Sequence, residues 1–215
     1  MEFALSEEQR LFADSLRGVL ADRVTVDALR RHAESGIGFD ADLWQALVEL
    51  GLPGLLVPER FGGAGLGVLD AAVAAEMLGA AATFAPFAGS VVMATLAFIH
   101  GATEEQQAEW LPRIASGEVR FGVGIMNGGR TEADIDAGEP THFLVYLPDG
   151  KATVLAAEDA LLRMHRSIDR TRPVTDVTFD PSRAITLNAA KRLVCRCSAV
   201  ATVPSPRLIV TSGQL

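Results

Sequence analysis

Residues 50–67, LGLPGLLVPERFGGAGLG, decide the fold of the N-terminal half of this chain. Gly51 stands where a left-handed residue commonly ends a helix. The preceding residues 42–50 carry an apolar face at helical spacing, made of Leu43, Trp44, Leu47 and Val48. The Ala-rich residues 68–78 that follow predict another helix that can pack closely. The stretch is therefore predicted to be a glycine-rich turn between two helices.

A second block, residues 101–118 (GATEEQQAEWLPRIASGE), repeats this pattern of helix end, turn and helix start. Thr103 and Gln106 have the spacing of a capping box, and the helix they begin is predicted to stop at Leu111, before Pro112. Ser6 and Gln9 form the same signal near the N-terminus. A helix is also predicted over 90–100, whereas 22–38, with Gly36 and Gly38, is predicted to be a loop.

After Gly117 the pattern changes to that of strands. The predicted strands are 119–126, 142–147, 152–156, 174–179 and 184–187, and residues 148–151 (PDGK) predict a hairpin turn. Helices followed by strands predict an α+β protein: an all-helical N-terminal domain, residues 1–116, and then a small antiparallel β-barrel-like domain, residues 117–190. Residues 191–215 form an atypical tail.

The composition excludes several classes of function. The chain has 215 residues, 49% of them hydrophobic, and a net charge of −8, which disfavours nucleic acid and anionic membranes as partners. The longest apolar stretch, 85–99, is shorter than the ~20 residues that span a bilayer, and no signal peptide precedes the first helix. We therefore expect a cytoplasmic protein.

The tail differs from the rest of the chain in charge. Residues 191–215 hold four basic and no acidic side chains, leaving 15 basic and 27 acidic ones in residues 1–190. Such a tail is typical of an out-of-frame reading of GC-rich coding sequence, and residues 195–215 are expected to be poorly ordered. Cys195 and Cys197 lack a second ligand pair, so no metal site is predicted.

Both helical blocks resemble the N-terminal domain of the flavin-dependent acyl-CoA dehydrogenases. The first resembles that family's loop in Pro58-Glu59-Arg60-Phe61-Gly62-Gly63-Ala64-Gly65, and the second resembles its helix pair. Residues 168–180 (IDRTRPVTDVTFD) are similar to the strand that closes its β domain. The resemblance implies FAD as cofactor, acyl-CoA as substrate, and a missing C-terminal helical domain.

By this resemblance Val123, Ile125, Met126 and Asn127 are the cofactor-binding residues and lie along the isoalloxazine ring. The chain departs from the family here, because Met126 replaces a threonine that donates a hydroxyl hydrogen bond to the flavin. The Glu-Pro after that threonine is absent, Thr131-Glu132 lacks a following proline, and the second flavin-contacting strand is not found. Flavin contact and ordinary strand core remain alternatives for these residues.

Two other motifs have structural explanations. Residues 61–67 (FGGAGLG) are glycine-rich like a dinucleotide-binding motif, but the spacing of their glycines is wrong. Pro58-Glu59-Arg60 also stands where that motif needs a strand. A turn that lines the acyl pocket fits better. The four histidines stand apart from any hydrolase motif, and none is assigned a catalytic role.

The resemblance implies α,β-dehydrogenation of an acyl-CoA thioester, in which a base takes the Cα proton and flavin takes a hydride from Cβ. The family's base is a glutamate of the C-terminal domain, so no catalytic residue is assigned in this chain. Two functions compete: a flavoprotein subunit impaired alone, partnered with itself or with a complete subunit, and a noncatalytic remnant or scaffold. Bulky sterol-derived CoA esters are compatible with the divergent loop.

Overall fold

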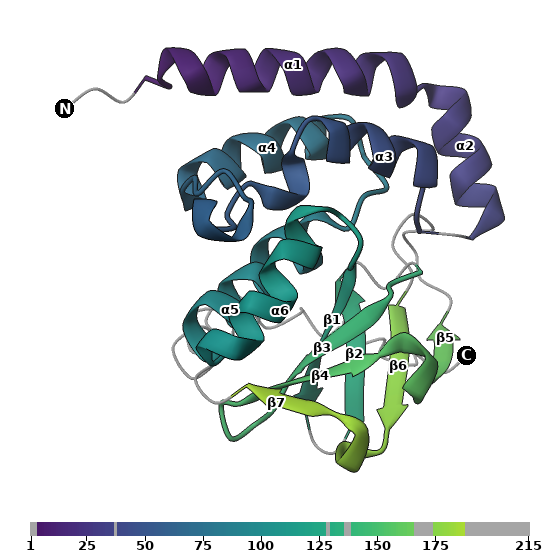
Figure 1. Ribbon diagram of the computed structural model, residues 1–215. Helices are drawn as coiled ribbons and strands as arrows, with labels where there is room; N and C mark the ends of the chain where they lie inside the picture. The colour runs from purple at the N-terminus through teal and green to yellow at the C-terminus, as the bar shows by residue number, and fades with distance from the viewer. Residues whose placement is uncertain (1–3, 37, 128–129, 136–138, 166–173, 188–215) are drawn as a thin grey trace, which may run out of the picture.

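The computed structural model describes residues 4–36, 38–127, 130–135, 139–165 and 174–187. Helices form the N-terminal part and a single sheet the C-terminal part (Figure 1). The α-helices are α1 (Glu7–Arg23), α2 (Val26–Ser35), α3 (Ala41–Glu49), α4 (Val68–Ala80), α5 (Thr95–Gly101) and α6 (Glu104–Ala115). Short 3-10 helices η1 (Leu52–Gly54) and η2 (Glu59–Phe61) and a π-helix η3 (Phe87–Ala94) lie between them.

The predicted capping boxes are confirmed. The Gln9 main-chain N–H donates to the Ser6 hydroxyl at 3.2 Å, and the Ser6 N–H donates to the Gln9 side-chain oxygen at 3.0 Å. Thr103 and Gln106 make the equivalent pair of bonds at the start of α6. Gly51 follows α3 with a left-handed φ of 74°, as its place in the sequence predicted.

Two helix predictions were wrong. Residues 22–38 contain α2, whose first turn is capped by the Thr25 side chain and whose end is closed by Gly36 at φ 71°. The helix α6 continues through Pro112 to Ala115. Leu111 and Ile114 on either side of the proline are buried in the core, and this packing outweighs the one helical hydrogen bond that proline removes.

The sheet has the strand order β5-β6-β2-β1-β3-β4-β7. Its strands are β1 (Phe121–Asn127), β2 (Arg130–Ile135), β3 (His142–Tyr146), β4 (Ala152–Ala156), β5 (Ala160–His165), β6 (Val174–Phe179) and β7 (Ile185–Leu187). All neighbours are antiparallel except β1 and β3, which are parallel. The α+β class with an antiparallel-rich second part is thus confirmed, but the described strands form an open sheet rather than a closed barrel.

Strands β2 and β5 were not predicted. The sequence of β2, RTEADI, is mostly polar, and its place is decided by pairing with β1 on one side and β6 on the other. Similarly β5, ALLRMH, is recognisable as a strand only through its full-length pairing with β6. Long-range backbone pairing therefore overrides weak local preference in both.

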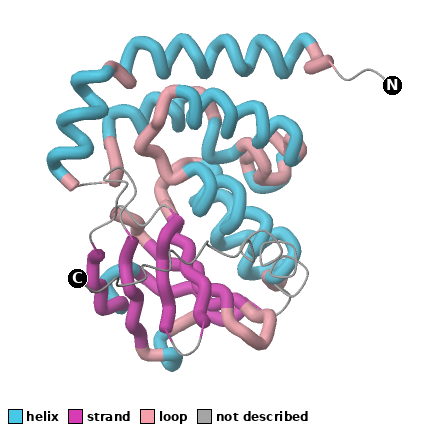
Figure 2. The backbone as a smooth tube through the Cα atoms, turned by 180° about the vertical axis from the view of Figure 1, so that it is seen from behind, coloured by secondary structure: helices cyan, strands magenta, loops and turns pink. Residues whose placement is uncertain are grey.

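Three apolar clusters hold the chain together. One fills the helical part and includes Trp44, and a second joins α5, α6 and η3 to one face of the sheet through residues such as Phe98 and Phe121. The third lies on the opposite face, around Phe143 and Val177. Figure 2 shows the helices gathered on one side of the sheet. The helix-facing side is thus the one on which helical and strand residues can form a joint site.

Most of the predicted helical core is confirmed. Trp44 is only 4% exposed, and its Nε1–H donates to the carbonyl oxygen of Gly117 at 3.1 Å. Phe61 is the exception, because it is partly buried against the cluster rather than inside it. The other residues expected in this core are buried: Leu47, Leu55, Leu78, Phe98 and Trp110.

The change from helices to strands falls between Ala115 and Phe121, beside the predicted boundary after residue 116. The division into domains 1–116 and 117–190 and a tail 191–215 remains a prediction. The tail, with Cys195 and Cys197, lies outside the described residues, as does the segment 195–215 that is predicted to be poorly ordered. Residues 168–173 of the 168–180 motif also lie outside them.

Candidate functional site

The predicted cofactor-binding residues of β1 do not share one face. Val123 is 0% exposed and belongs to the cluster between the sheet and the helices. Ile125 is partly buried against the same cluster, whereas Met126 packs on the opposite face, against the cluster around Phe143. This separation follows from the two-residue repeat of a strand. For Asn127 the structure describes the backbone, at the end of β1.

The pairing of β1 changes at its last residues. Its register with β3 ends at Ile125, opposite Tyr146. Met126 and Asn127 still pair with β2, opposite Thr131 and Arg130. Among the described strands, therefore, the β3 side of these last two residues is unpaired, and their backbone groups there can bond to a ligand.

The π-helix η3 completes the surroundings of this strand end. Met93 of η3 is partly buried against the cluster that also contains Tyr146 and contacts Ile125. The Tyr146 hydroxyl donates to the Met93 carbonyl oxygen at 3.4 Å. Met93, Ile125 and Tyr146 therefore meet at one place, on the helix-facing side of the sheet. π-Helical turns are frequent at functional sites.

Sequence reasoning missed Met93 and Tyr146. A signal was present in the chain, because Tyr146 is its only tyrosine and directly follows the apolar run Phe143-Leu144-Val145. A phenol in such a strand needs a hydrogen-bond partner when it is buried. The partner could not be named from the sequence, since Met93 lies 53 residues away and offers only its backbone.

The glycine-rich segment is a tightly packed turn. The Ala64 N–H donates to the Gly54 carbonyl oxygen, and the Gly65 N–H to that of Val57, each at 2.9 Å. A Cβ on Gly63 would lie 2.1 Å from the Val57 oxygen, so only glycine fits there. The segment runs from η2 to α4 without a preceding strand, which excludes the dinucleotide-binding motif.

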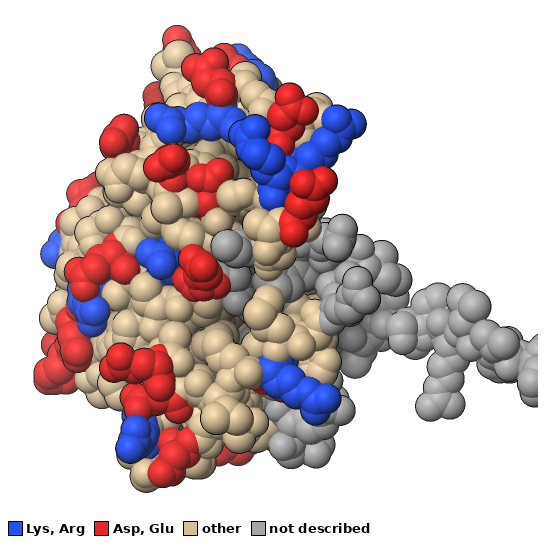
Figure 3. All heavy atoms as spheres, turned by 90° about the vertical axis from the view of Figure 1, so that its right-hand side faces the viewer, with Lys and Arg blue, Asp and Glu red and all other residues tan. Residues whose placement is uncertain are grey.

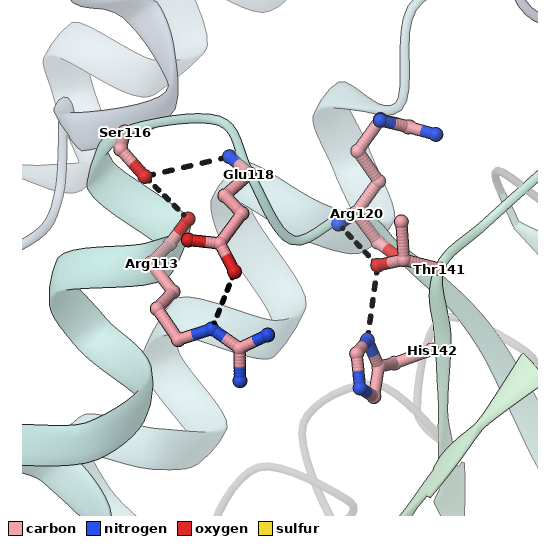
Figure 4. Close-up of polar contacts among 6 residues, drawn as sticks. All are labelled: Arg113, Ser116, Glu118, Arg120, Thr141 and His142. Atoms are coloured by element: carbon pink, nitrogen blue, oxygen red, sulfur yellow. Dashed lines mark hydrogen bonds and ion pairs between the residues drawn. The ribbon is translucent and has the colours of Figure 1, made fainter.

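Polar contacts close the turn between α6 and β1 (Figure 4). Arg113 donates through Nε to Glu118 at 2.8 Å, and the Ser116 hydroxyl donates to the Arg113 carbonyl oxygen at 3.0 Å. The two charged side chains are substantially exposed, so this pair contributes little to stability. These contacts define the turn and leave no group oriented for catalysis.

Thr141 links the starts of β1 and β3 (Figure 4). Its hydroxyl donates to the Arg120 carbonyl oxygen at 3.1 Å and accepts from the Arg120 main-chain N–H at 2.9 Å. The His142 Nδ1 lies 3.0 Å from the same oxygen. Because the hydroxyl proton is already donated to Arg120, Nδ1 is assigned as the protonated nitrogen of His142.

His142 is an aromatic core residue. Its ring centroid lies 5.0 Å from that of Trp110, edge-on, and 5.8 Å from that of Phe121. Burial lowers the pKa of His142, and the positive charge of Arg113 lowers it further, against a smaller opposing effect of Glu118. The imidazole is therefore neutral near pH 7, and it serves packing rather than proton transfer.

Arg120 joins the helical part to the sheet. Its guanidinium lies over the ring of Phe39, 4.4 Å from the ring centroid, and its Nη2 donates to the Glu139 carbonyl oxygen at 3.3 Å. Partial burial lowers the pKa of Arg120, partly offset by the charge of Glu139. An arginine remains charged after such a shift, so this contact is structural.

The remaining candidates give no further site. His32 contacts the Phe39 carbonyl oxygen, and His165 forms an ion pair with Asp176. Among the described residues no group of His, Cys, Asp or Glu is arranged to hold a metal ion. Figure 3 shows acidic and basic side chains interspersed on one face, unlike the continuous basic surface of nucleic-acid-binding proteins. In the described part of the chain, every helix is too short or too polar to cross a bilayer.

Comparison with known proteins gives a consistent result. Residues 6–118 match the family model of the acyl-CoA dehydrogenase N-terminal domain. Acyl-CoA dehydrogenase IpdE2 of Mycolicibacterium smegmatis is 36% identical over 108 residues, which are 49% of this chain and 35% of that protein. (2S)-Methylsuccinyl-CoA dehydrogenase of Cereibacter sphaeroides is 32% identical over 54% of this chain and 21% of its own length. The chain thus spans about a third or less of these relatives.

The similarity to solved structures extends into the sheet. The steroid ACAD variant Tcur3481–Tcur3483 has a TM-score of 0.72 and 25% identity, over 86% of this chain and 58% of that one. The ChsE4–ChsE5 complex of Mycobacterium tuberculosis has a TM-score of 0.73 over 94% of this chain and 63% of that one. At 19% identity the second comparison shows the fold alone.

Proposed function

Because this chain belongs to the acyl-CoA dehydrogenase family, we propose that it is an acyl-CoA dehydrogenase-like flavoprotein subunit. In this proposal it contributes to α,β-dehydrogenation of an acyl-CoA thioester with FAD, and it is impaired when alone. The observation that carries the proposal is the meeting of Met93, Ile125 and Tyr146 at the end of the predicted flavin strand. Met93 and Ile125 are only partly buried and offer an apolar surface that suits a planar ring or an acyl chain, and Tyr146, 3% exposed, supports them from the core.

The described residues fit FAD in part. Ile125 supplies apolar contact on the helix-facing side, whereas the Met126 side chain faces the other side of the sheet. The backbone of 126–127, unpaired by any described strand on the β3 side, supplies hydrogen-bonding groups. A methionine at 126 cannot supply the hydroxyl donor that the resemblance leads one to expect. Val123 is enclosed in the core and acts through packing. Bound FAD would accept the hydride, while the chain's own residues would align the ring and exclude water.

The chain alone is proposed to lack a catalytic base. Dehydrogenation needs a group that takes the Cα proton, and removing a general base typically costs about 10²–10⁴-fold in rate. Glu59 and Glu76 are exposed on the helical part, in η2 and α4. Neither belongs to the surroundings of Ile125 described above. The backbone of Glu132 lies opposite Ile125 in β2.

In this proposal a partner chain supplies the catalytic base. The neighbouring structures Tcur3481–Tcur3483 and ChsE4–ChsE5 are named as two-component assemblies, which supports a hetero-oligomer with a complete acyl-CoA dehydrogenase subunit. A homo-oligomer is the simpler form of the same proposal. The name of the first neighbour, a steroid ACAD, supports a bulky acyl group in fatty acid or steroid catabolism. A cytoplasmic location completes the proposal.

The alternative function is that of a noncatalytic remnant or scaffold. Met126 favours it, because the side chain at this position cannot hydrogen-bond to flavin as a hydroxyl can. One experiment separates the two functions: the visible spectrum of the purified chain is recorded with added FAD, alone and after mixing with a complete acyl-CoA dehydrogenase subunit. Electron transfer from a panel of acyl-CoA thioesters is then assayed.

We expect little flavin and no turnover from the chain alone, and more of both in the mixture than in the second subunit by itself. If the mixture has the same flavin content and turnover as the second subunit by itself, the scaffold function is supported. Stoichiometric flavin with measurable turnover by the chain alone would show that it contains its own base, and Glu59, Glu76 and Glu132 would be the first residues to test.

A further inference from the structure

The strand β5 (Ala160–His165) is an unprotected edge of the described sheet. It pairs with β6 along its whole length, and no other described strand pairs with it. Leu161, Leu162 and Met164 are 75%, 43% and 64% exposed. Figure 1 places this strand at the outer side of the sheet, away from the helices. Edge strands are usually protected by charged side chains, proline or a bulge, and β5 has no proline and no bulge, with Arg163 and His165 as its charged or titratable side chains.

We propose that β5 pairs antiparallel with β5 of a second copy of this chain. The two sheets would then form one continuous sheet across a two-fold axis. An isologous contact of this kind requires a self-complementary surface. The inference rests on the edge strand alone and does not depend on the proposed function.

The charges around β5 are self-complementary. The turn before the strand, η4 (Ala157–Asp159), ends in Glu158 and Asp159, whereas the second half of the strand carries the exposed Arg163 and His165. A two-fold axis through the strand places the acidic end of each copy against the basic end of the other. Opposite charges across an antiparallel pair are stabilising. A parallel arrangement would instead place like charges together.

These charged groups already have partners within one copy. Asp159 accepts from Arg183 at 2.7 Å, and His165 lies 2.8 Å from Asp176. Contact across the axis would bring these two ion pairs together into one network with both signs balanced. Networks are the arrangement in which exposed ion pairs contribute most.

Two considerations set the register between the two β5 strands: which side of the sheet each side chain faces, and which charges would lie opposite each other. Directly opposite residues of an antiparallel pair face the same side of the sheet, so a two-fold axis passes through one residue position. An axis at Leu162 pairs Ala160 with Met164, and Leu161 with Arg163, of the other copy. An axis at Arg163 would oppose two guanidinium groups, which is destabilising. An axis at Leu161 would leave Met164 outside the paired segment.

Packing supports the axis at Leu162. This residue lies opposite Val177 of β6 in the register, and Val177 belongs to the cluster around Phe143. Ala160, two residues earlier, contacts the same cluster. Side chains at 160, 162 and 164 therefore face one side. Leu162 of both copies, with Ala160 and Met164, would extend that cluster across the axis.

A disulfide at the axis tests the geometry. In a background with Cys195→Ser and Cys197→Ser, the Leu162→Cys variant would place two thiols opposite each other. Opposite Cα atoms of an antiparallel pair are about 4.5–5.5 Å apart, within the range of disulfides. We expect a disulfide-linked dimer under mild oxidation. The matched control is Leu69→Cys on α4, more accessible at 62% exposure than Leu162 at 43%, which should form no disulfide-linked dimer.

Charge variants at Leu161 test the register. Leu161→Lys opposes Arg163 twice across the axis, and it should raise the dimer dissociation constant by at least about tenfold in sedimentation velocity. In the Leu161→Glu variant the new carboxylate lies opposite Arg163 of the other copy, so the dimer dissociation constant should be unchanged or lower. Val68→Lys, at an exposed residue of α4, controls for added charge. A chain that remains monomeric at all concentrations, or a dimer insensitive to Leu161→Lys, overturns the proposal.

Discussion

The Tyr146 hydroxyl donates a hydrogen bond to the main-chain carbonyl oxygen of Met93, at 3.4 Å, and so joins strand β3 to the π-helix η3. Tyr146 also lies opposite Ile125 in the parallel register of β1 and β3. The π-helix that carries Met93 is thereby positioned by β3, the strand next to Ile125 of β1.

Removing this hydroxyl should weaken ligand binding more than stability. Tyr146→Phe keeps the ring and loses one long hydrogen bond, so we expect a cost of about 0.5–1.5 kcal/mol in the free energy of unfolding. Flavin or acyl-CoA binding should fall as well, because Met93 is no longer positioned. Thr153→Val is the control, since it removes a similar bond, to the Ile185 carbonyl oxygen. Equal binding by both variants would contradict a positioning role for Tyr146.

Truncating Trp44 should be costly, because its side chain is buried in the helical core. Trp44→Ala removes a buried indole and its bond to Gly117, with an expected loss of about 3–5 kcal/mol. Trp44→Phe keeps most of the packing and should cost less. Urea denaturation of the three proteins measures the difference, and an unchanged midpoint for Trp44→Ala would be inconsistent with its burial.

Two glycines should respond oppositely to the same substitution. Gly63→Ala places a Cβ 2.1 Å from the Val57 carbonyl oxygen, which the backbone must move to relieve, so the melting temperature should fall. Gly79→Ala, inside α4, meets nothing within 4 Å and should stabilise by about 0.5–1 kcal/mol. Thermal melts of both variants, compared with the parent, test the packing of the glycine-rich turn.

His142 should make the protein sensitive to acid. Burial and Arg113 lower its folded-state pKa, so below the unfolded pKa of ~6.5 the unfolded chain binds more protons. Its contribution to stability is therefore complete above that pH and is lost as the pH falls through the folded pKa. NMR titration should give a pKa for His142 below the ordinary histidine value of ~6.5. His142→Phe should flatten the pH dependence of unfolding in this window.

A hydroxyl at residue 126 should improve flavin retention if the flavin-subunit function is correct. Met126→Thr introduces a donor at the end of β1, on the face of the sheet around Phe143, so a gain in flavin would show that part of the cofactor reaches that face. A hydrogen bond of this kind contributes about 0.5–1.5 kcal/mol. The ratio of flavin to protein absorbance after purification is the measurement. Ile185→Thr, on β7, is the control for a threonine in a strand. An identical flavin content in both variants favours the scaffold function.

Local signals explain which elements could be predicted. The capping boxes at Ser6 and Thr103 and the glycine at 51 act through bonds between residues a few positions apart, so the sequence alone reveals them. Helix α2 was missed because most of its residues are polar and none of them is fully buried. Pro112 misled the prediction of α6, since a local rule was outweighed by packing of distant residues.

The sequence by itself determined the change from a helical to a strand-rich part, the glycine-rich turn and the family resemblance, because each depends on short-range spacing. Only the tertiary structure decided which residues meet. It placed Val123 in the core and Met126 on the opposite face from Ile125, and it brought Met93 to Tyr146 across 53 residues. It also left β5 at an edge. Contacts between distant segments depend on how whole elements pack, and no local pattern encodes them.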